Sequence, residues 1–219
     1  MKVIGAGLNK TGTKTLRYHL MQWGFRHRSY ELEAFRMYQA GRIDELLNSM
    51  EDYDSFEDWP WPLMFREIDE RFADARFVLT TRRSPEVWYR SLCKMAVRMG
   101  PLNDFEKHIY GHAMPHGKKR HHTAFYERHN QQVRDHFGDR PDKLLQLSWD
   151  DGDTAEKLAD FLGLTDVDTK PHHENKSLPV YGGDNLALAH VNRIVFQSRW
   201  RIAGVSRKIK RKLRRSSNR

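Results

Sequence analysis

The stretch VIGAGLNKTGTKT, residues 3–15, decides the fold because it joins a short apolar segment to a glycine-containing turn. Residues 1–6 predict a short buried β-strand, and the turn occupies residues 7–13. A helix is expected to follow, because apolar residues return at helical spacing at Leu16, Leu20 and Trp23. Gly24 is a typical helix end. The chain is therefore expected to open with a strand, a glycine turn and a helix.

The clearest strand in the sequence is FVLTT, residues 77–81, which is rich in β-branched and apolar residues. Its composition is typical of an interior strand of a parallel sheet. Two arginines follow it, and Ser84-Pro85-Glu86 then begins a helix with an N-cap residue and a proline in the first turn. The inner face of this helix is expected to carry Trp88, Leu92, Met95 and Met99.

Strand and helix patterns alternate along the rest of the chain. Helical spacing over residues 30–52 is interrupted at Gly41, and a weak second strand is expected at residues 53–58. A helix is expected after Pro60 and Pro62, and a loop or lid with short helical pieces at 101–122. The later elements are a long helix carrying Phe125 to Phe137, a strand at 144–148 and a helix capped by Asp153 or Thr154. This alternation predicts an α/β protein with a doubly wound, mainly parallel sheet.

The net charge of +9 is unevenly placed along the chain. Residues 185–219 hold eleven Lys and Arg and no Asp or Glu, which leaves 27 basic against 29 acidic residues in 1–184. We therefore expect an α/β domain at residues 1–184 and a basic amphipathic helix and tail at 185–219. Specific binding of a nucleic acid is not expected, because the excess charge is confined to the tail and not spread over a folded face.

Several features of the composition predict a cytoplasmic protein. No apolar run approaches the ~20 residues that a membrane-spanning helix needs. The first apolar stretch is short and contains glycines, so no cleavable signal peptide is expected. The single cysteine, Cys93, suits a reducing compartment.

The turn after the first strand is expected to bind an anion. A helix N-terminus presents N–H groups without intrahelical partners and the positive end of the helix dipole. Lys10 adds a positive charge, and Thr11, Thr13 and Thr15 add hydroxyl donors. The spacing nearly matches the nucleotide-binding P-loop, but Lys14 stands one place later than the lysine of that motif. The alternative is a glycine-rich turn that binds nothing.

Arg82 and Ser91 form a second candidate site. An arginine at the carboxyl end of an interior strand lies at the crevice where open α/β sheets bind ligands, and Ser91 lies on the helix that follows. P-loop enzymes that use ATP or GTP usually place an acidic residue for Mg²⁺ on a neighbouring strand, whereas Arg82 and Arg83 follow this one. The pattern favours a nucleotide bound without a metal ion. The alternative is a surface arginine pair with a helix-face serine.

Lys10-Thr11-Gly12-Thr13 resembles the K-[ST]-G-T loop of sulfotransferases that use 3′-phosphoadenosine 5′-phosphosulfate (PAPS). Residues 77–91 resemble the segment of that family that binds the 3′-phosphate. Further similarity to the single-domain sulfotransferase group is found at Asp58-Trp59-Pro60, residues 126–130 and residues 171–176. The resemblance covers about residues 2–177. It implies a three-layer, P-loop NTPase-like fold, with a sheet flanked by helices and an added basic C-terminal helix.

The resemblance also implies which residues hold PAPS. The residues expected to hold the phosphosulfate end are Lys10, Thr11, Gly12, Thr13, Lys14 and Thr15. Arg82 and Ser91 are expected to bind the 3′-phosphate, although Arg83 has the eight-residue spacing to Ser91 that is common in the broader family. Lys14 and Arg83 both depart from the group's usual pattern.

The implied reaction is transfer of a sulfuryl group from PAPS to a hydroxyl or amine of a small-molecule, saccharide or lipid acceptor. Lys10 is expected to stabilise the leaving phosphate, and Asp58 is the first candidate for the base that deprotonates the acceptor. Asp58 could instead only cap the following helix. The substitute bases are Glu57, His112, His116 and His129. Two alternative functions remain. One is a P-loop kinase of nucleosides or other small molecules that uses ATP and Mg²⁺, and the other is a non-catalytic protein that binds anions or membranes.

Two remaining features concern partners. His108 and His112 stand at i, i+4, but no metal site is expected, because neither the H-E-x-x-H pattern nor a cysteine ligand accompanies them. Residues 191–215 alternate apolar and basic side chains, which is typical either of a helix lying on an anionic membrane surface or of a C-terminal helix packed on the body. The first option adds peripheral attachment to the inner membrane face.

Overall fold

The computed structural model describes residues 1–100, 105–112, 114–171 and 185–216. The chain divides into two compact units, the first made of residues 1–88 and 123–176 and the second of residues 89–122 and 177–219. The predicted domain boundary after residue 184 falls next to residues outside the described ranges, and it stays a prediction.

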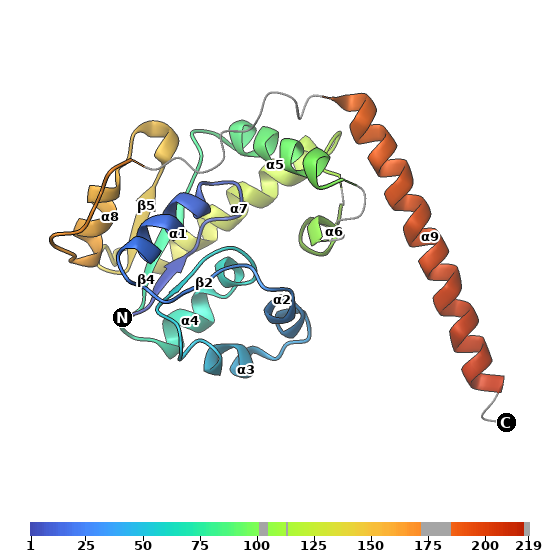
Figure 1. The fold of residues 1–219 in the computed structure, drawn as a ribbon, viewed down its shortest axis with the longest axis horizontal. Coiled ribbons are helices and arrows are strands. Elements are labelled where there is room, and N and C mark those ends of the chain that lie inside the picture. The colour runs from blue at the N-terminus through green and yellow to red at the C-terminus, as the bar shows by residue number, and fades with distance from the viewer. Residues whose placement is uncertain (101–104, 113, 172–184, 217–219) are drawn as a thin grey trace. The chain divides into compact units, whose positions relative to one another are not determined.

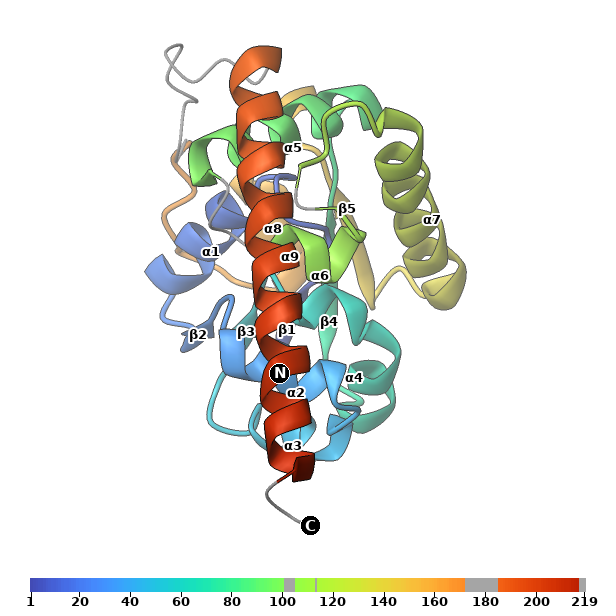
Figure 2. The same ribbon diagram turned by 90° about the vertical axis from the view of Figure 1, so that its right-hand side faces the viewer.

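The first unit is built on a sheet of five strands (Figure 1 and Figure 2). The strands are β1 (Val3–Gly5), β2 (His27–Arg28), β3 (Ser55–Phe56), β4 (Arg76–Thr80) and β5 (Leu144–Leu147). Their order is β2-β3-β1-β4-β5, and every neighbouring pair is parallel. The predicted parallel α/β sheet is confirmed. The sequence pattern does not predict β2, because its two residues are both polar, so β3 is the third strand along the chain and not the second.

This topology brings the candidate site residues to one edge of the sheet. Since parallel strands end at the same edge, the segments that follow β1, β3, β4 and β5 all begin there. The first strand lies between β3 and β4, so the chain moves outward from it in both directions. Such a switch point is where open α/β sheets form their binding crevice.

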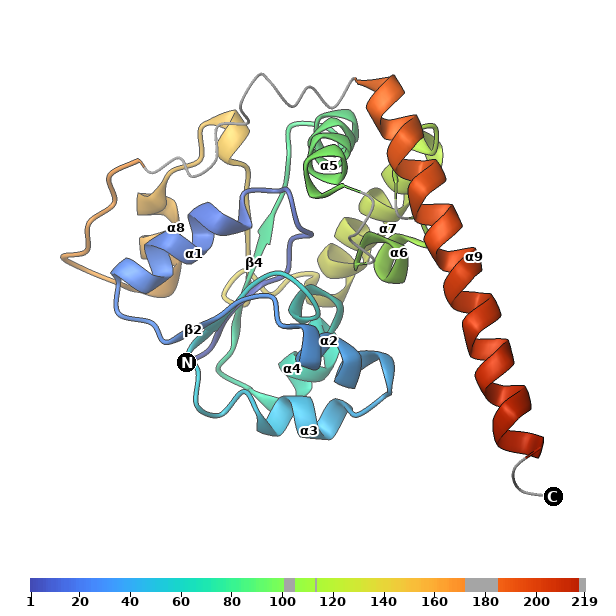
Figure 3. The same ribbon diagram turned by 45° about the vertical axis from the view of Figure 1, so that its right-hand side comes forward.

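Helices cover both faces of the sheet, as predicted. On one face, Leu16 and Leu20 of α1 (Thr13–Gln22) and Leu158 and Leu162 of α8 (Ala155–Leu162) pack with Val78 of the sheet. Figure 3 shows α1 and α8 side by side. Gly24, with a φ of 86°, follows α1 where the sequence predicts its end.

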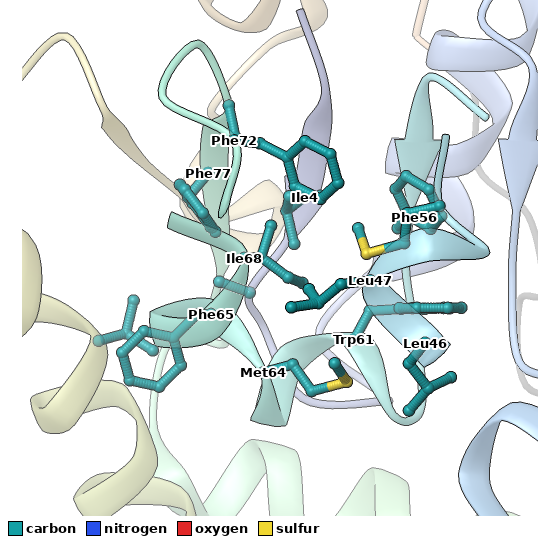
Figure 4. Packing of buried hydrophobic residues seen from close by; sticks show 14 of the residues in the cluster. Ile4, Leu46, Leu47, Phe56, Trp61, Met64, Phe65, Ile68, Phe72 and Phe77 are labelled. Atoms are coloured by element: carbon teal, nitrogen blue, oxygen red, sulfur yellow. The ribbon is translucent and has the colours of Figure 1, made fainter. Parts of the chain in front are cut away.

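The other face carries the larger core (Figure 4). Ile4, Phe56 and Phe77 point from three strands into a cluster of side chains from the helices. These helices are α2 (Leu32–Gln39), α3 (Ile43–Asn48), α4 (Phe65–Arg71) and α7 (Lys119–Phe137). Two short 3₁₀ helices, η1 (Trp61–Leu63) and η2 (Trp149–Asp151), follow β3 and β5. The sheet is thus the middle of three layers.

The described residues of the second unit form helices and the segments that connect them, with no strand. The unit contains most of α5 (Pro85–Met99), α6 (Phe105–Tyr110) and the long α9 (Leu186–Ser216), which Figure 2 shows as one continuous helix. A small core joins α5 to α9 and is made by Ala96, Val97, Met114 and Ala189. Within the described ranges, no helix combines the length and the apolar character needed to cross a bilayer.

Candidate functional site

The loop between β1 and α1 presents a row of backbone N–H groups. Lys10 and Gly12 have φ values of 70° and 96°, so the backbone turns sharply before α1 begins. None of the backbone hydrogen bonds formed among the described residues uses the N–H groups of Thr11, Gly12, Thr13 or Lys14. The helix has no side-chain N-cap either. Four N–H groups and the helix dipole therefore favour an anion at this point.

The hydroxyl groups of the loop bind other parts of the protein. Thr11 Oγ1 donates to the Leu8 carbonyl at 2.6 Å and lies 2.6 Å from Thr80 Oγ1 on β4. The Thr13 hydroxyl donates to the Glu57 carboxylate. Both threonines are buried, so their contribution to an anion would come from their backbone N–H groups.

Three contacts fix the course of the loop. Trp88 Nε1 donates to the Asn9 carbonyl at 2.9 Å, and His129 Nε2 donates to the Ala6 carbonyl at 2.8 Å. Gly7 packs directly on β4: a Cβ at this position would lie 2.4 Å from the Thr80 carbonyl oxygen, closer than van der Waals contact allows. The loop is therefore rigidly supported before any ligand binds.

Two adjacent carboxylates follow β3 and differ sharply in their surroundings. Glu57 is only 1% exposed, and it accepts hydrogen bonds from the hydroxyls of Ser29 and Thr13. His27 Nε2 lies 3.8 Å from Glu57 Oε1. Burial opposes the charge of Glu57, but these donors together hold its pKa below the ordinary value. Glu57 is thus an ionised group that joins β2, β3 and the start of α1.

Asp58 has the opposite shift. Burial and the neighbouring charge of Glu57 raise its pKa to about 7, although the N–H of Trp59 and the charges of Lys10 and Lys14 act in the other direction. Its backbone is left-handed, with a φ of 63°, and Asp58 Oδ1 accepts the Trp59 N–H at 2.8 Å. A carboxylate of this basicity next to two lysines is suited to accepting a proton near neutral pH.

The two arginines after β4 are held by carboxylates after β5. Arg82 Nη1 lies 2.6 Å from Asp150 Oδ1, and Arg82 Nε donates to the Lys10 carbonyl at 2.8 Å. Arg83 contacts Asp151 Oδ1 through Nε at 3.0 Å, but its side chain is 67% exposed, against 24% for Arg82. Arg82 therefore belongs to the loop site, whereas Arg83 lies at its margin.

Trp149 completes the edge of the site. Its ring packs on Gly12 so closely that a Cβ there would lie 2.3 Å from Trp149 Cδ1. The indole Nε1 is buried, and no hydrogen-bond acceptor among the described residues reaches it. A buried donor beside the row of loop N–H groups fits an anionic ligand.

Other predicted residues are placed differently. His129 is buried, and burial lowers its pKa to about 4, so it supports the loop as a neutral imidazole. Ser91, His112 and His116 belong to the second unit, and their predicted roles stay predictions. Of the predicted motif at 171–176, residues 172–176 lie outside the described residues. Among the residues that the structure describes, no cluster of His, Cys, Asp and Glu could hold a metal ion.

Residues 2–177 match the family model of the sulfotransferase domain, which covers the sheet and every part of the site described above. The chain belongs to the sulfotransferase domain family. The general activity of this sulfotransferase is the transfer of a sulfuryl group, and the predicted family and fold class are confirmed. No curated protein matches it.

Sequence reasoning missed three residues that shape this sulfotransferase site. Asp150 follows β5 at the same edge as Arg82, and the polar residues after that strand are the signal that could have revealed it. Trp88 stacks on Tyr126 with ring centroids 4.8 Å apart. The Tyr126 hydroxyl in turn accepts the Arg82 N–H at 2.9 Å. The spacing of Tyr126 and His129 on α7 indicates one helix face, but not which loops that face supports.

Proposed function

We propose that this sulfotransferase moves a sulfuryl group from PAPS to a hydroxyl or amine of its acceptor, with Lys10 and Asp58 as the catalytic residues. The observation that carries the proposal is the set of four N–H groups, from Thr11 to Lys14, that donate to no backbone carbonyl among the described residues, together with a nearby carboxylate whose pKa is about 7. The first feature suits a phosphate, and the second suits proton removal from an acceptor. A kinase reaction would use both features and would need a Mg²⁺ site in addition.

The phosphate end of the donor fits the loop. Thr11, Gly12, Thr13 and Lys14 would bind it through backbone N–H groups, and the Trp149 indole N–H adds a further donor. Lys10 would neutralise the negative charge that grows on the bridging oxygen. PAPS, when bound, would supply the sulfuryl group, and 3′-phosphoadenosine 5′-phosphate would be the leaving group. Because the loop is already fixed by its contacts, these donors need little reorganisation.

Asp58 fits the role of base better than Glu57. The Glu57 carboxylate accepts hydrogen bonds from Ser29 and Thr13, and its pKa is lowered. Asp58 has the raised pKa, so it accepts the acceptor's proton more readily at neutral pH. Burial of Glu57 in its ionised form therefore prepares Asp58 for proton abstraction.

Arg82 is the group that we assign to the 3′-phosphate. One N–H of its guanidinium contacts Lys10 and another contacts Asp150, which leaves further donors of its planar fork for a phosphate. The ion pair with Asp150 fixes the guanidinium at the carboxyl end of β4.

Two measurements test the proposal. Turnover with PAPS should proceed in the presence of a metal chelator, whereas turnover of ATP with Mg²⁺ but not of PAPS would contradict it. Calorimetry should show that 3′-phosphoadenosine 5′-phosphate binds more tightly than AMP. Arg82→Ala should weaken the bisphosphate roughly 10- to 100-fold and leave AMP nearly unchanged. The matched control is Arg71→Ala, which removes an exposed arginine at the end of α4 that pairs with Glu51.

A further inference from the structure

The two compact units carry opposite net charge. The second unit contains 18 Lys and Arg against three Asp and Glu, a net of +15, so the first unit has a net of −6. The basic excess therefore extends beyond the tail that the sequence singles out and includes residues 89–122. A cavity of about 760 Å³ in this unit is lined by the cationic side chains of Lys107, Lys118, Arg193 and Arg201.

The long helix α9 has two apolar faces of different kinds. Its inner face, Ala189 and Phe196, is buried in the second unit, where Ala189 joins the small core and Phe196 lies under the Lys107 ammonium at 5.7 Å. The contacts of Ala189 and Phe196 agree with the alternative that the first turns of this C-terminal helix pack on the protein. The exposed apolar residues of α9 also include Leu186 and Ile194, and Ile194 lines the cavity. Four others form a second apolar stripe, Leu188, Val191, Val195 and Ile202.

The exposed stripe runs along residues 188–202 of the helix. Its residues are separated by three, four and seven positions, which places them on one face of α9. Val205 and Ile209 continue the same spacing in the sequence. The other positions of residues 193–215 include ten Lys and Arg and no acidic residue. A narrow apolar stripe between basic faces is typical of a helix that lies in a membrane interface.

We propose that α9 attaches this sulfotransferase to the surface of an anionic lipid bilayer, with the exposed stripe inserted among the acyl chains and the basic side chains at the lipid phosphates. The inner face keeps α9 on the second unit, so packing and membrane binding are compatible. The proposal does not depend on the donor or on the base assigned above.

Charge decides between a membrane and two other occupants of the stripe. The spacing would also suit a coiled coil with a second copy of the chain, but the flanks of both helices would then be basic and would repel each other. A nucleic acid would neutralise the charge, but its backbone would leave the apolar stripe in water. An anionic bilayer both buries the apolar stripe and neutralises the basic side chains beside it.

The test is sedimentation of the full chain with lipid vesicles. Vesicles of phosphatidylcholine with about 30% phosphatidylserine should bind the protein at ~0.1 M salt, and binding should fall at least tenfold at ~1 M salt, where charges are screened. Vesicles of phosphatidylcholine alone should bind it weakly. Absence of binding to the anionic vesicles would overturn the proposal.

Matched variants separate the stripe from the charge. Val191→Ser, Val195→Ser and Ile202→Ser together should weaken binding about 100-fold, because each apolar side chain contributes roughly fivefold to partitioning. Serine has a helix propensity similar to that of valine and isoleucine, so α9 should persist, as circular dichroism can verify. The control is His190→Ser with Gln197→Ser, two exposed positions on another face of α9, and it should bind within threefold of the wild type.

Three results would contradict the proposal. The first is vesicle binding by the stripe variant equal to that of the wild type. The second is a dimer of the wild type in light scattering that the stripe variant loses, which would assign the stripe to a second copy. The third is tight binding of duplex DNA that outcompetes anionic vesicles.

Discussion

Asp58→Asn should make the protein more stable at alkaline pH while it removes the proposed base. The ionised Asp58 is disfavoured in the folded protein, because burial and the charge of Glu57 raise its pKa from 3.8 to about 7. Asparagine has nearly the same shape and no charge. It also tolerates the left-handed backbone at this position, where φ is 63°.

The size and sign of the effect follow from proton linkage. Between pH 3.8 and pH 7 the folded protein binds a proton at Asp58 that the unfolded chain has released, so this group makes the protein less stable as pH rises through that window. The full difference corresponds to about 4 kcal/mol at pH 8 and to about 2 kcal/mol at pH 5. Because Asp58 is half-buried, solvent reduces these values, and we expect Asp58→Asn to gain about 1–2 kcal/mol more at pH 8 than at pH 5.

Urea unfolding at the two pH values measures this difference directly. The free energy of unfolding of wild type and variant is compared at pH 5 and pH 8, with Asp139→Asn, an exposed carboxylate after α7, as the control for loss of one charge. Turnover of the variant at pH 7 should fall ~100-fold or more with donor affinity intact. The same stability difference at both pH values would refute the raised pKa, and full activity would refute the role as base.

Three further predictions concern the loop and its supports. Lys10→Ala should lower kcat about 100- to 1,000-fold in a sulfuryl-transfer assay, and the exposed Lys14→Ala should have a smaller effect; equal effects would contradict the role of Lys10. Gly7→Ala should destabilise the protein by about 1–3 kcal/mol in urea unfolding, because its Cβ would meet the Thr80 carbonyl at 2.4 Å. His129 has its pKa lowered to about 4, so its contribution to stability should be lost as pH falls from 6.5 toward 4. His129→Gln should flatten that part of the pH–stability curve, and an unchanged curve would argue against a buried neutral imidazole.

The fold could be predicted from sequence wherever the hydrophobic pattern is long. The strand before the loop, the strand at 77–81 and the helices that follow each have enough apolar residues at regular spacing to show their type. The strand β2 has only two residues, and it is a strand because β3 beside it supplies hydrogen bonds. No local pattern contains that information, since it depends on pairing with residues 28 positions away.

The sequence predicted which residues lie at the site, but not the contacts that these residues make with one another. The loop, Asp58 and Arg82 all stand directly after strands, so parallel topology alone brings them to one edge. Whether a hydroxyl of the loop faces a ligand or the protein depends on side-chain positions. Thr11 and Thr13 bind protein atoms, and a sequence cannot distinguish that use from phosphate binding. The same limit applies to Asp150, whose partner lies 68 residues away.

The strand β2, which the sequence pattern does not predict, affects the proposed chemistry. His27 lies on β2, and Ser29 follows it immediately; both contact Glu57 and help to keep it ionised in a buried position. The charge of Glu57 in turn raises the pKa of Asp58. The two adjacent carboxylates therefore have opposite pKa shifts: Glu57 accepts hydrogen bonds from two hydroxyls and lies near His27, whereas Asp58 is desolvated by burial and has the charge of Glu57 beside it. The basicity of the proposed catalytic residue thus depends on an edge strand of two residues.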